Sequence, residues 1–327
     1  MQRFLNDPDD LVDETVAGFV KAHRDLVHLS ADNPRVVVSN SARTAGRVGI
    51  VTGGGSGHEP AFIGYTGRNL VDAVAVGEIF SSPTAKSFAD AIRVANGGAV
   101  LYGNYAGDNM NVKMAARMVA KDGIEVATVV ANDDVCSAPM SEREKRRGVA
   151  GEIFMWKIGG AKAALGANLI EVQAAAQKAI DACRSVGVGL GPCTLPAVGH
   201  PNFAIEPGTM EVGIGHHGEP GTRVEPLKSA NAVADDMLKI VMDDHALAAG
   251  SEVAVLLSGL GATSVNELYV LYDRIEVGLT GMGMTVHRAY VGNYFTSLEM
   301  VGATLTVLAL DAELKSLLDM DCASPAF

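Results

Sequence analysis

RVGIVTGGGSGHEP, residues 47–60, is the stretch that decides the fold class of this chain of 327 residues. Its first six residues, Arg47 to Thr52, form a short apolar and β-branched run of the kind found in buried strands. Successive glycines follow directly, and Pro60 suits the first turn of a helix. A strand that passes through a tight glycine-rich loop into a helix is a unit of α/β folds, so the stretch predicts that class.

Similar patterns continue along the chain and extend the α/β prediction. Further short apolar runs predict strands at 98–102, 124–131 and 253–258, and a last apolar segment covers 303–310. Longer amphipathic segments predict helices at 87–96, 110–121, 148–166, 169–186, 230–244 and 265–274. The alternation is typical of strands separated by crossover helices.

Chain length and one irregular stretch predict two α/β domains. A chain of 327 residues exceeds one ordinary domain. Between Gly187 and Pro226 the regular periodicity is lost while glycine and proline accumulate, which indicates a functional loop region or a linker. We therefore expect an N-terminal α/β domain at 1–188 and a C-terminal α/β domain at 189–327.

Composition and charge argue against several classes of partner. The formal net charge is −12, from 38 acidic and 26 basic residues, so the basic surface of a nucleic-acid-binding protein is not expected. The sequence contains neither the apolar region of a signal peptide nor an apolar run of the roughly 18 residues that span a membrane. Four cysteines without metal-type spacing are expected to be reduced thiols. These features predict a cytoplasmic protein that binds neither nucleic acid nor membranes.

The glycine-rich segment can hold a ligand, but it lacks the known nucleotide signatures. Backbone N–H groups of successive glycines approach phosphate or hydroxyl oxygens closely, and a following helix N-terminus adds a positive dipole. No Gly-Lys-Ser/Thr completes a P-loop, and His58 stands at the third glycine of the dinucleotide fingerprint. His58 and Glu59 also lack the second histidine of a zinc-protease helix. The alternative is a structural turn in which His58 bonds to nearby backbone.

Two histidines, His216 and His217, lie among glycines in the irregular stretch, within GIGHHGEPG at 213–221. A neutral imidazole acts as a nucleophile or a base near neutral pH, because its ordinary pKa is about 6.5. Adjacent histidines rarely direct both rings at one ion, and the sequence suggests no third ligand nearby, so a metal is not expected. An inert loop is the remaining alternative.

A third polar segment, YGNYAGDNMN at 102–111, follows another expected strand. It places Asp108 at a junction between a strand and a helix. In open α/β sheets, ligands bind at that edge. Asp108 is therefore a candidate ligand-binding residue, although aspartate at such a position is also a common helix N-cap.

Together these segments resemble the K subunit of dihydroxyacetone (glycerone) kinases along nearly the whole chain. The segments that carry the resemblance are GGGSGHEP at 53–60, GEIFSSP at 77–83, NYAGD at 104–108, RGVAG at 147–151, PCTLP at 192–196, GIGHHGEPG at 213–221 and GNYFTSLEM at 292–300. Because many segments match in order, the resemblance is more specific than any single glycine-rich motif.

The resemblance implies an enzyme subunit that takes part in phosphorylating a short ketose. His217 would form a hemiaminal with the ketone carbon of dihydroxyacetone, His58 would act as acid and base at the reacting hydroxyl, and Asp108 would bind and activate that hydroxyl. The other implied substrate-binding residues are Gly55, Ser56 and Gly57. The resemblance also implies two α/β domains with the site at their interface, and a homodimer. Relatives that act as transcriptional co-activators lack the hemiaminal histidine, whereas His217 is present here.

One position departs from the family pattern. Relatives commonly carry lysine before the Asn-Tyr pair of the third segment, and this chain has Gly103. The loss of a substrate-facing cationic side chain removes a donor and is expected to enlarge the pocket. This favours a tetrulose such as erythrulose as the alternative substrate to dihydroxyacetone. His216 occupies a position that is apolar in many relatives, and its role is open.

The phosphoryl group is expected to come from a partner protein. The sequence contains no nucleotide-binding loop with Mg²⁺-binding acidic residues, and it ends without the helical L domain of fused relatives. The resemblance implies that a separate DhaL-type subunit binds ATP or ADP with Mg²⁺, while this chain binds no cofactor. In the family, free ATP or a phosphotransferase-system phosphocarrier recharges that subunit. An unrelated α/β oxidoreductase is the other enzyme alternative, and it would need the missing dinucleotide fingerprint.

Overall fold

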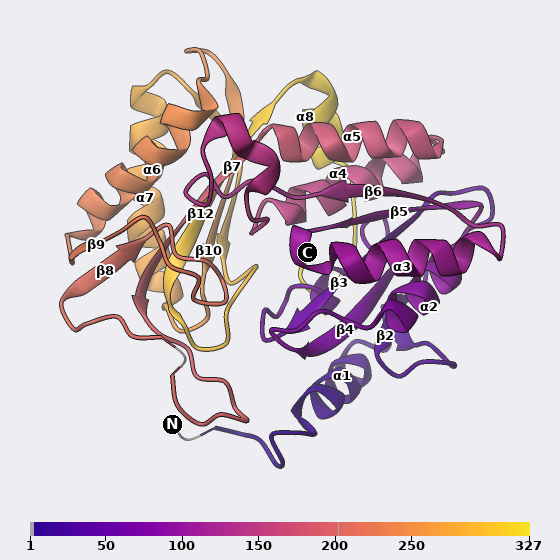
Figure 1. Ribbon diagram of the computed structural model, residues 1–327. Coiled ribbons are helices and arrows are strands. Elements are labelled where there is room, and N and C mark those ends of the chain that lie inside the picture. The colour runs from indigo at the N-terminus through magenta and orange to yellow at the C-terminus, as the bar shows by residue number, and fades with distance from the viewer. Residues whose placement is uncertain (1–2, 202) are drawn as a thin grey trace. The chain divides into compact units, whose positions relative to one another are not determined.

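The structure, a computed structural model, describes residues 3–201 and 203–327, and these form two compact units (Figure 1). Unit 1 lies within Met1–Val130, Glu152–Lys178 and Ser316–Phe327, and unit 2 contains Ala131–Gly151 and Ala179–Lys315. This division differs from the single boundary expected at residue 188. That residue lies inside strand β7 (Cys183–Gly191), which pairs with β12 (Val301–Leu310) along nearly its whole length, so a boundary there would cut one sheet.

Unit 1 is built on a six-stranded sheet in the order β1-β2-β4-β3-β5-β6. Its strands are β1 (Val27–Leu29), β2 (Val36–Ser39), β3 (Gly49–Ser56), β4 (Ala73–Ile79), β5 (Ala99–Asn104) and β6 (Glu125–Val130). The last four strands run parallel to one another, whereas β1 and β2 add an antiparallel edge. β3 therefore lies between two parallel neighbours.

Helices cover both faces of this sheet (Figure 1). They are α1 (Leu11–Ala22), α2 (Ala85–Ala95), α3 (Asn109–Ala120), α4 (Glu152–Ala164) and α5 (Leu169–Asp181). On one face, Val51 and Tyr102 belong to the same buried cluster as Phe88 of α2. A Cβ atom at Gly159 of α4 would lie 3.4 Å from Leu101, the neighbour of Tyr102 along β5. Because successive strand residues point to opposite faces, α2 and α4 cover opposite faces of the sheet.

Unit 2 contains a second six-stranded sheet in the order β11-β10-β12-β7-β8-β9. Its remaining strands are β8 (Thr209–Val212), β9 (Arg223–Pro226), β10 (Glu252–Gly259) and β11 (Thr285–Gly292). Its helices are η3 (Met140–Lys145, a 3-10 helix), α6 (Ala230–His245) and α7 (Val265–Gly281), and α8 (Ala312–Leu318) returns the chain to unit 1. β10 and β11 pair in parallel, and the other neighbouring strands pair antiparallel.

The two faces of the second sheet are covered differently. α6 and α7 pack on one face, where Val233 and Leu268 join a buried cluster with Ala303 and other strand residues (Figure 1). The next strand residue, Thr304, points to the opposite face, and its Oγ1 lies 3.2 Å from His216 Nε2. The histidine-containing loop therefore approaches the sheet from the face opposite α6 and α7.

The α/β class is confirmed, and most expected strands and helices lie within a few residues of their predicted positions. Two expectations about residues 169–226 are wrong. The helix expected at 169–186 ends at Asp181, because β7 begins at Cys183 and its apolar residues complete the core of unit 2. The irregular stretch at 187–226 contains β8 and β9, so it extends a sheet in addition to forming loops.

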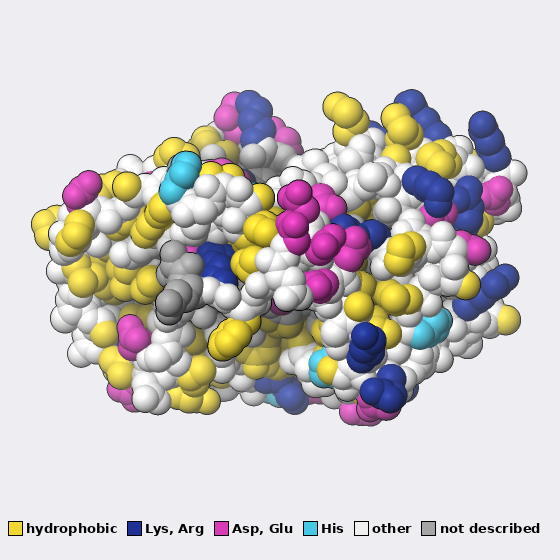
Figure 2. Space-filling view, turned by 90° about the horizontal axis from the view of Figure 1, so that it is seen from below, with side chains coloured by type: hydrophobic (Ala, Val, Ile, Leu, Met, Phe, Trp, Pro, Cys, Tyr) yellow, Lys and Arg dark blue, Asp and Glu magenta, His cyan; other side chains and the backbone are white. Residues whose placement is uncertain are grey.

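The surface carries charges of both signs. The face shown in Figure 2 carries Lys and Arg side chains as well as acidic side chains, among apolar and uncharged polar atoms. Among the residues that the structure describes, every helix is too short or too polar to cross a lipid bilayer.

Candidate active site

The glycine-rich segment belongs to the sheet of unit 1. Residues 53–55 lie inside β3, and every residue of that strand is buried. A Cβ atom at Gly54 would lie 2.1 Å from the Phe62 ring, and one at Gly55 would lie 2.6 Å from the backbone nitrogen of Ser81. The next helical element is the short 3-10 helix η1 (Ile63–Tyr65). The expected loop before a helix N-terminus is therefore wrong, and these glycines instead let neighbouring segments pack closely.

Local contacts hold the residues at the end of β3. Ser56 Oγ donates a hydrogen bond to Gly77 O at 2.9 Å. Gly57 has a φ of +99°, a conformation that glycine adopts readily, and its N–H donates to Glu59 Oε2 at 2.9 Å. Burial raises the pKa of the Glu59 carboxyl, and hydrogen bonds from backbone N–H groups offset this only in part.

His58 is a buried imidazole directly after this turn. Only 1% of its surface is exposed. Its ring stacks on Phe80 at a centroid distance of 4.8 Å and meets the Phe62 ring edge-on at 6.2 Å. Because these rings restrict rotation of the imidazole, its nitrogens keep a fixed direction, which a proton-transfer residue needs.

Asp108 lies at the expected junction, at the end of the 3-10 helix η2 (Ala106–Asp108) and before α3. Asp108 occupies the N-cap position of α3, as the alternative expected, but its buried side chain makes no capping hydrogen bond to the helix. Burial raises the pKa of Tyr102, and the negative charge of Asp108 raises it further. A buried aspartate that does not cap its helix is a candidate for a functional role.

The sheet brings His58 and Asp108 to one edge of unit 1. β3 and β5 are parallel neighbours, and β4 lies on the other side of β3. The chain therefore continues from β3 to β4 on one side of β3, and later places β5 on the other side of β3. Ligands of open α/β sheets bind at such a switch point, beyond the carboxyl ends of the strands. His58 follows β3 and Asp108 follows β5, so both lie at that edge.

Gly103 does not leave an empty space in the structure. A Cβ atom at Gly103 would lie 2.9 Å from Met155 Cε, so the Met155 thioether occupies this place. The Gly103 carbonyl accepts a hydrogen bond from Trp156 Nε1 at 2.9 Å. The expected enlargement of a pocket at Gly103 is therefore not found within unit 1, although the donor of a lysine is still missing.

His217 lies in unit 2, in the loop between β8 and β9, where Glu219 binds it twice. The His217 backbone N–H donates to Glu219 Oε2 at 2.9 Å. The ring Nδ1 lies 3.0 Å from Oε1 of the same carboxylate. The two side chains are 30% and 40% exposed, so small molecules in solvent can reach them. Sequence reasoning missed Glu219, and its only signal was the His-x-Glu spacing.

The surroundings of Glu219 keep it ionised. Burial alone would raise its pKa, but the hydrogen bond and charge of His217, with backbone N–H groups, lower it to about 2. A Cβ atom at Gly215 would lie 2.1 Å from Glu219 Oε2 and 2.7 Å from Arg147 Nη1. Arg147 is itself held by an ion pair with Asp134 at 2.7 Å. The glycine at 215 therefore makes room for the carboxylate.

His216 is buried, unlike the neighbouring His217. It is 6% exposed, and its ring lies against Phe295 at a centroid distance of 4.6 Å. Burial, followed by the charge of His217, lowers its pKa to about 3, so the ring is neutral at physiological pH. Within residues 3–201 and 203–327, no three His, Cys, Asp or Glu side chains are grouped so as to hold a metal ion.

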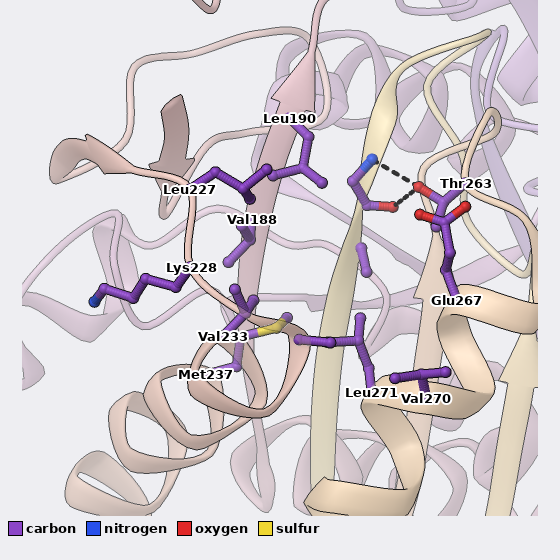
Figure 3. Close-up of a pocket in the computed structure, with 13 residues that line it drawn as sticks. Val188, Leu190, Leu227, Lys228, Val233, Met237, Thr263, Glu267, Val270 and Leu271 are labelled. Carbon is purple, nitrogen blue, oxygen red and sulfur yellow. Dashed lines mark hydrogen bonds between the residues drawn. The ribbon is translucent and has the colours of Figure 1, made fainter. Parts of the chain in front are cut away.

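A separate cavity of about 260 Å³ lies between the sheet of unit 2 and its helices (Figure 3). It is mainly aliphatic, with Val188 on β7, Val233 and Met237 on α6, and Leu271 on α7. Thr263 Oγ1 is bonded to the backbone of Gly302 at 2.6 and 2.8 Å. The cavity lies on the face covered by α6 and α7, whereas the loop with His216 approaches the opposite face. We therefore do not assign it to the candidate site.

A family model and curated relatives match nearly the whole chain. The model described as "Dak1 domain" matches residues 17–326. The dihydroxyacetone-binding subunit DhaK of PTS-dependent dihydroxyacetone kinase 2 from Listeria innocua is 42% identical, over 100% of this chain and 99% of its own. An L-erythrulose 1-kinase from Mycolicibacterium smegmatis is 41% identical over 100% of this chain, which spans 58% of that protein.

Solved structures resemble this one closely. The dihydroxyacetone kinase operon co-activator Dha-DhaQ is 30% identical with a TM-score of 0.88, covering 96% of this chain and 97% of its own. The dihydroxyacetone kinase of C. freundii in complex with AMP-PNP and Mg²⁺ is 29% identical with a TM-score of 0.90, covering 99% of this chain and 60% of its own. The fold expected from the resemblance is thereby confirmed.

Proposed function

Because the chain belongs to the Dak1 domain family, we propose that it is the ketose-binding subunit of a dihydroxyacetone-type kinase. The match over full length to a dihydroxyacetone-binding subunit, at 42% identity, is the observation that carries this proposal. The relatives include both dihydroxyacetone and erythrulose kinases, which supports kinase chemistry in general. His217, His58 and Asp108 are the residues to which we assign the chemistry.

The binding step is the addition of His217 to the ketone. The Nε2 lone pair attacks the carbonyl carbon, an N–C bond forms and the C=O π bond breaks. The resulting alkoxide takes up a proton, the ring gives up one to solvent, and the product is a neutral hemiaminal. Glycerol has no carbonyl group and cannot form this bond. Covalent capture thus selects ketoses over polyols of nearly the same shape.

The transfer step needs a base and a positioned hydroxyl. We assign this task to His58 and Asp108, which follow neighbouring strands of unit 1. The terminal hydroxyl oxygen of the ketose attacks the γ-phosphorus of the nucleotide, and its proton passes to this pair. The new O–P bond forms as the bond to the departing ADP breaks. Such a reaction is governed by positioning and charge stabilisation, which buried, rigid side chains provide.

The phosphoryl donor belongs to a partner in this proposal. A DhaL-type subunit would bind ATP or ADP with Mg²⁺, and either free ATP or a phosphocarrier protein would recharge it. The similar C. freundii kinase was solved with AMP-PNP and Mg²⁺ in a chain of which this one covers 60%, which supports a nucleotide site elsewhere in the assembly. A homodimer and a cytoplasmic location complete the proposal.

Two ketose classes are candidates for the substrate. Dihydroxyacetone is favoured by the relative that is 42% identical and is matched over 99% of its own length. Erythrulose is favoured by the kinase with 41% identity and by the missing lysine at Gly103. Met155 fills the place that a side chain at Gly103 would take, so the missing lysine does not enlarge the pocket there. The argument for erythrulose from this position therefore rests on the lost hydrogen-bond donor alone.

A substrate panel with the purified chain and its DhaL-type partner tests the proposal. Dihydroxyacetone, both erythruloses and glycerol would be compared, with ATP or a charged phosphocarrier as donor. We expect phosphorylation of a ketose, none of glycerol, and none without the partner. Failure of every ketose to bind or react would leave the co-activator function of the similar Dha-DhaQ structure as the better explanation.

A further inference from the structure

Glu219 does more than hold the loop between β8 and β9. One oxygen of its carboxylate accepts a hydrogen bond from the backbone N–H of His217 at 2.9 Å, and the other lies 3.0 Å from ring Nδ1 of the same residue. Fixing both the backbone and the ring of the same residue restricts the side-chain torsions of His217. The imidazole is therefore oriented before any ligand arrives.

The same contact selects one tautomer of His217. A carboxylate that is ionised has no proton to donate and only accepts hydrogen bonds. Against the effect of burial, the hydrogen bonds that Glu219 accepts lower its pKa, so its carboxylate is ionised throughout the physiological range. The proton of the neutral ring therefore lies on Nδ1, and the lone pair lies on Nε2.

From these contacts we propose that Glu219 is the positioning residue of the covalent step, setting the nucleophilic tautomer of His217 and stabilising the cationic ring that forms as Nε2 bonds to the ketone carbon. This inference rests on the proposed function, because it assigns a role within that step. When Nε2 forms the N–C bond, the ring becomes positively charged while its proton remains on Nδ1. The carboxylate 3.0 Å away stabilises that charge until the proton leaves for solvent.

The glycines on either side of His217 also support this role. Gly215 N–H donates to Glu219 O at 2.9 Å, and Gly218 N–H donates to Gly215 O at 3.1 Å, which closes a tight turn around His217. At Gly215, a methyl group would lie 2.1 Å from Glu219 Oε2. Gly215→Ala should therefore displace the carboxylate while leaving both His217 and Glu219 in the sequence.

The first measurement needs no substrate. Heteronuclear NMR of protein labelled at the histidine ring nitrogens reports which nitrogen carries the proton, and the His217→Gln variant identifies the signals of His217. We expect the Nδ1–H form in the unaltered chain and a shift toward Nε2–H, the form that a neutral histidine side chain prefers in water, in Glu219→Ala and Gly215→Ala. Glu206→Gln, which changes an exposed glutamate of the same stretch, should leave the tautomer unchanged. An Nε2–H form in the unaltered chain would overturn the proposal.

The second measurement is the rate of adduct formation with dihydroxyacetone or erythrulose. Glu219→Gln keeps an acceptor but loses the charge, and we expect a rate about 10 to 100 times lower, the range found when a group that orients a metal-binding histidine is replaced. An unchanged rate would also overturn the proposal. If the unaltered chain forms no adduct, the proposed function fails while the tautomer result still decides whether Glu219 orients His217. The two failures are therefore distinguishable.

Discussion

Replacing His216 with glutamine is expected to make the stability of unit 2 less sensitive to acid. Burial is the main reason why the pKa of His216 falls from 6.5 to about 3 in the folded protein. As the pH falls below the higher value, the unfolded chain binds a proton on this ring and the folded chain does not, so stability is lost. The loss is about 1.4 kcal/mol per pH unit down to the folded pKa, which gives about 2 kcal/mol near pH 5.

Glutamine removes this ionisation with little other change. Its amide can still bond to Thr304, while the ring contact with Phe295 is lost. Amide hydrogen exchange of β12, measured near pH 7.5 and near pH 5, gives the free energy of unfolding of unit 2. Exchange of β3 serves as a reference within unit 1. His200→Gln, at an exposed histidine of the same unit, is the matched control.

The test compares the free energy of unfolding of unit 2 in the unaltered chain and in His216→Gln, and follows how the gap between the two values changes with pH. We expect His216→Gln to be less stable than the unaltered chain near neutral pH, and the gap to narrow by about 2 kcal/mol near pH 5. A gap that stays constant within about 0.5 kcal/mol would refute the conclusion that His216 is buried and neutral. The His200→Gln control should show no comparable narrowing.

Two further predictions concern glycines of unit 1. Gly54→Ala places a methyl group 2.1 Å from the Phe62 ring and should lower the free energy of unfolding by about 1 to 3 kcal/mol, measured by urea denaturation with Trp156 fluorescence. Gly18→Ala, on helix α1 with no atom within 4 Å, is the control and should be neutral or stabilising. Gly103→Lys should also destabilise, because its Cβ would lie 2.9 Å from Met155 Cε. Adding Met155→Ala should lower stability by less than the sum of the two single changes, and strict additivity would show that the two sites do not interact.

The fold class could be predicted because it rests on local patterns. The apolar run ending at Thr52 is buried as β3, and helices near 87–96, 110–121 and 230–244 lie close to where amphipathic periodicity places them. The strand conformation of residues 53–55 could not be predicted from such local patterns. Glycine is depleted in strands, and only contacts with Phe62, Ser81 and other distant residues explain why β3 continues through them.

The candidate site was predictable in part for a similar reason. His58 and Asp108 lie where the ends of parallel strands were expected, because a sheet edge follows from strand order. The burial of His216 could not be predicted, since it depends on Thr304 and Phe295 far along the chain. The hydrogen bonds between Glu219 and His217 depend on the turn that the loop adopts, which spacing alone does not specify.

Covalent capture of a ketose by His217 is the central claim, and NMR of a ketose labelled at its carbonyl carbon tests it most directly. On mixing with the purified chain, we expect the carbonyl resonance of the bound ketose to be replaced by that of a saturated carbon bonded to oxygen and nitrogen. The matched variants are His217→Gln, which should give no such signal, and His200→Gln, which should retain it. A saturated-carbon signal that persists in full in His217→Gln, or that never forms with any triose or tetrulose, would contradict the account.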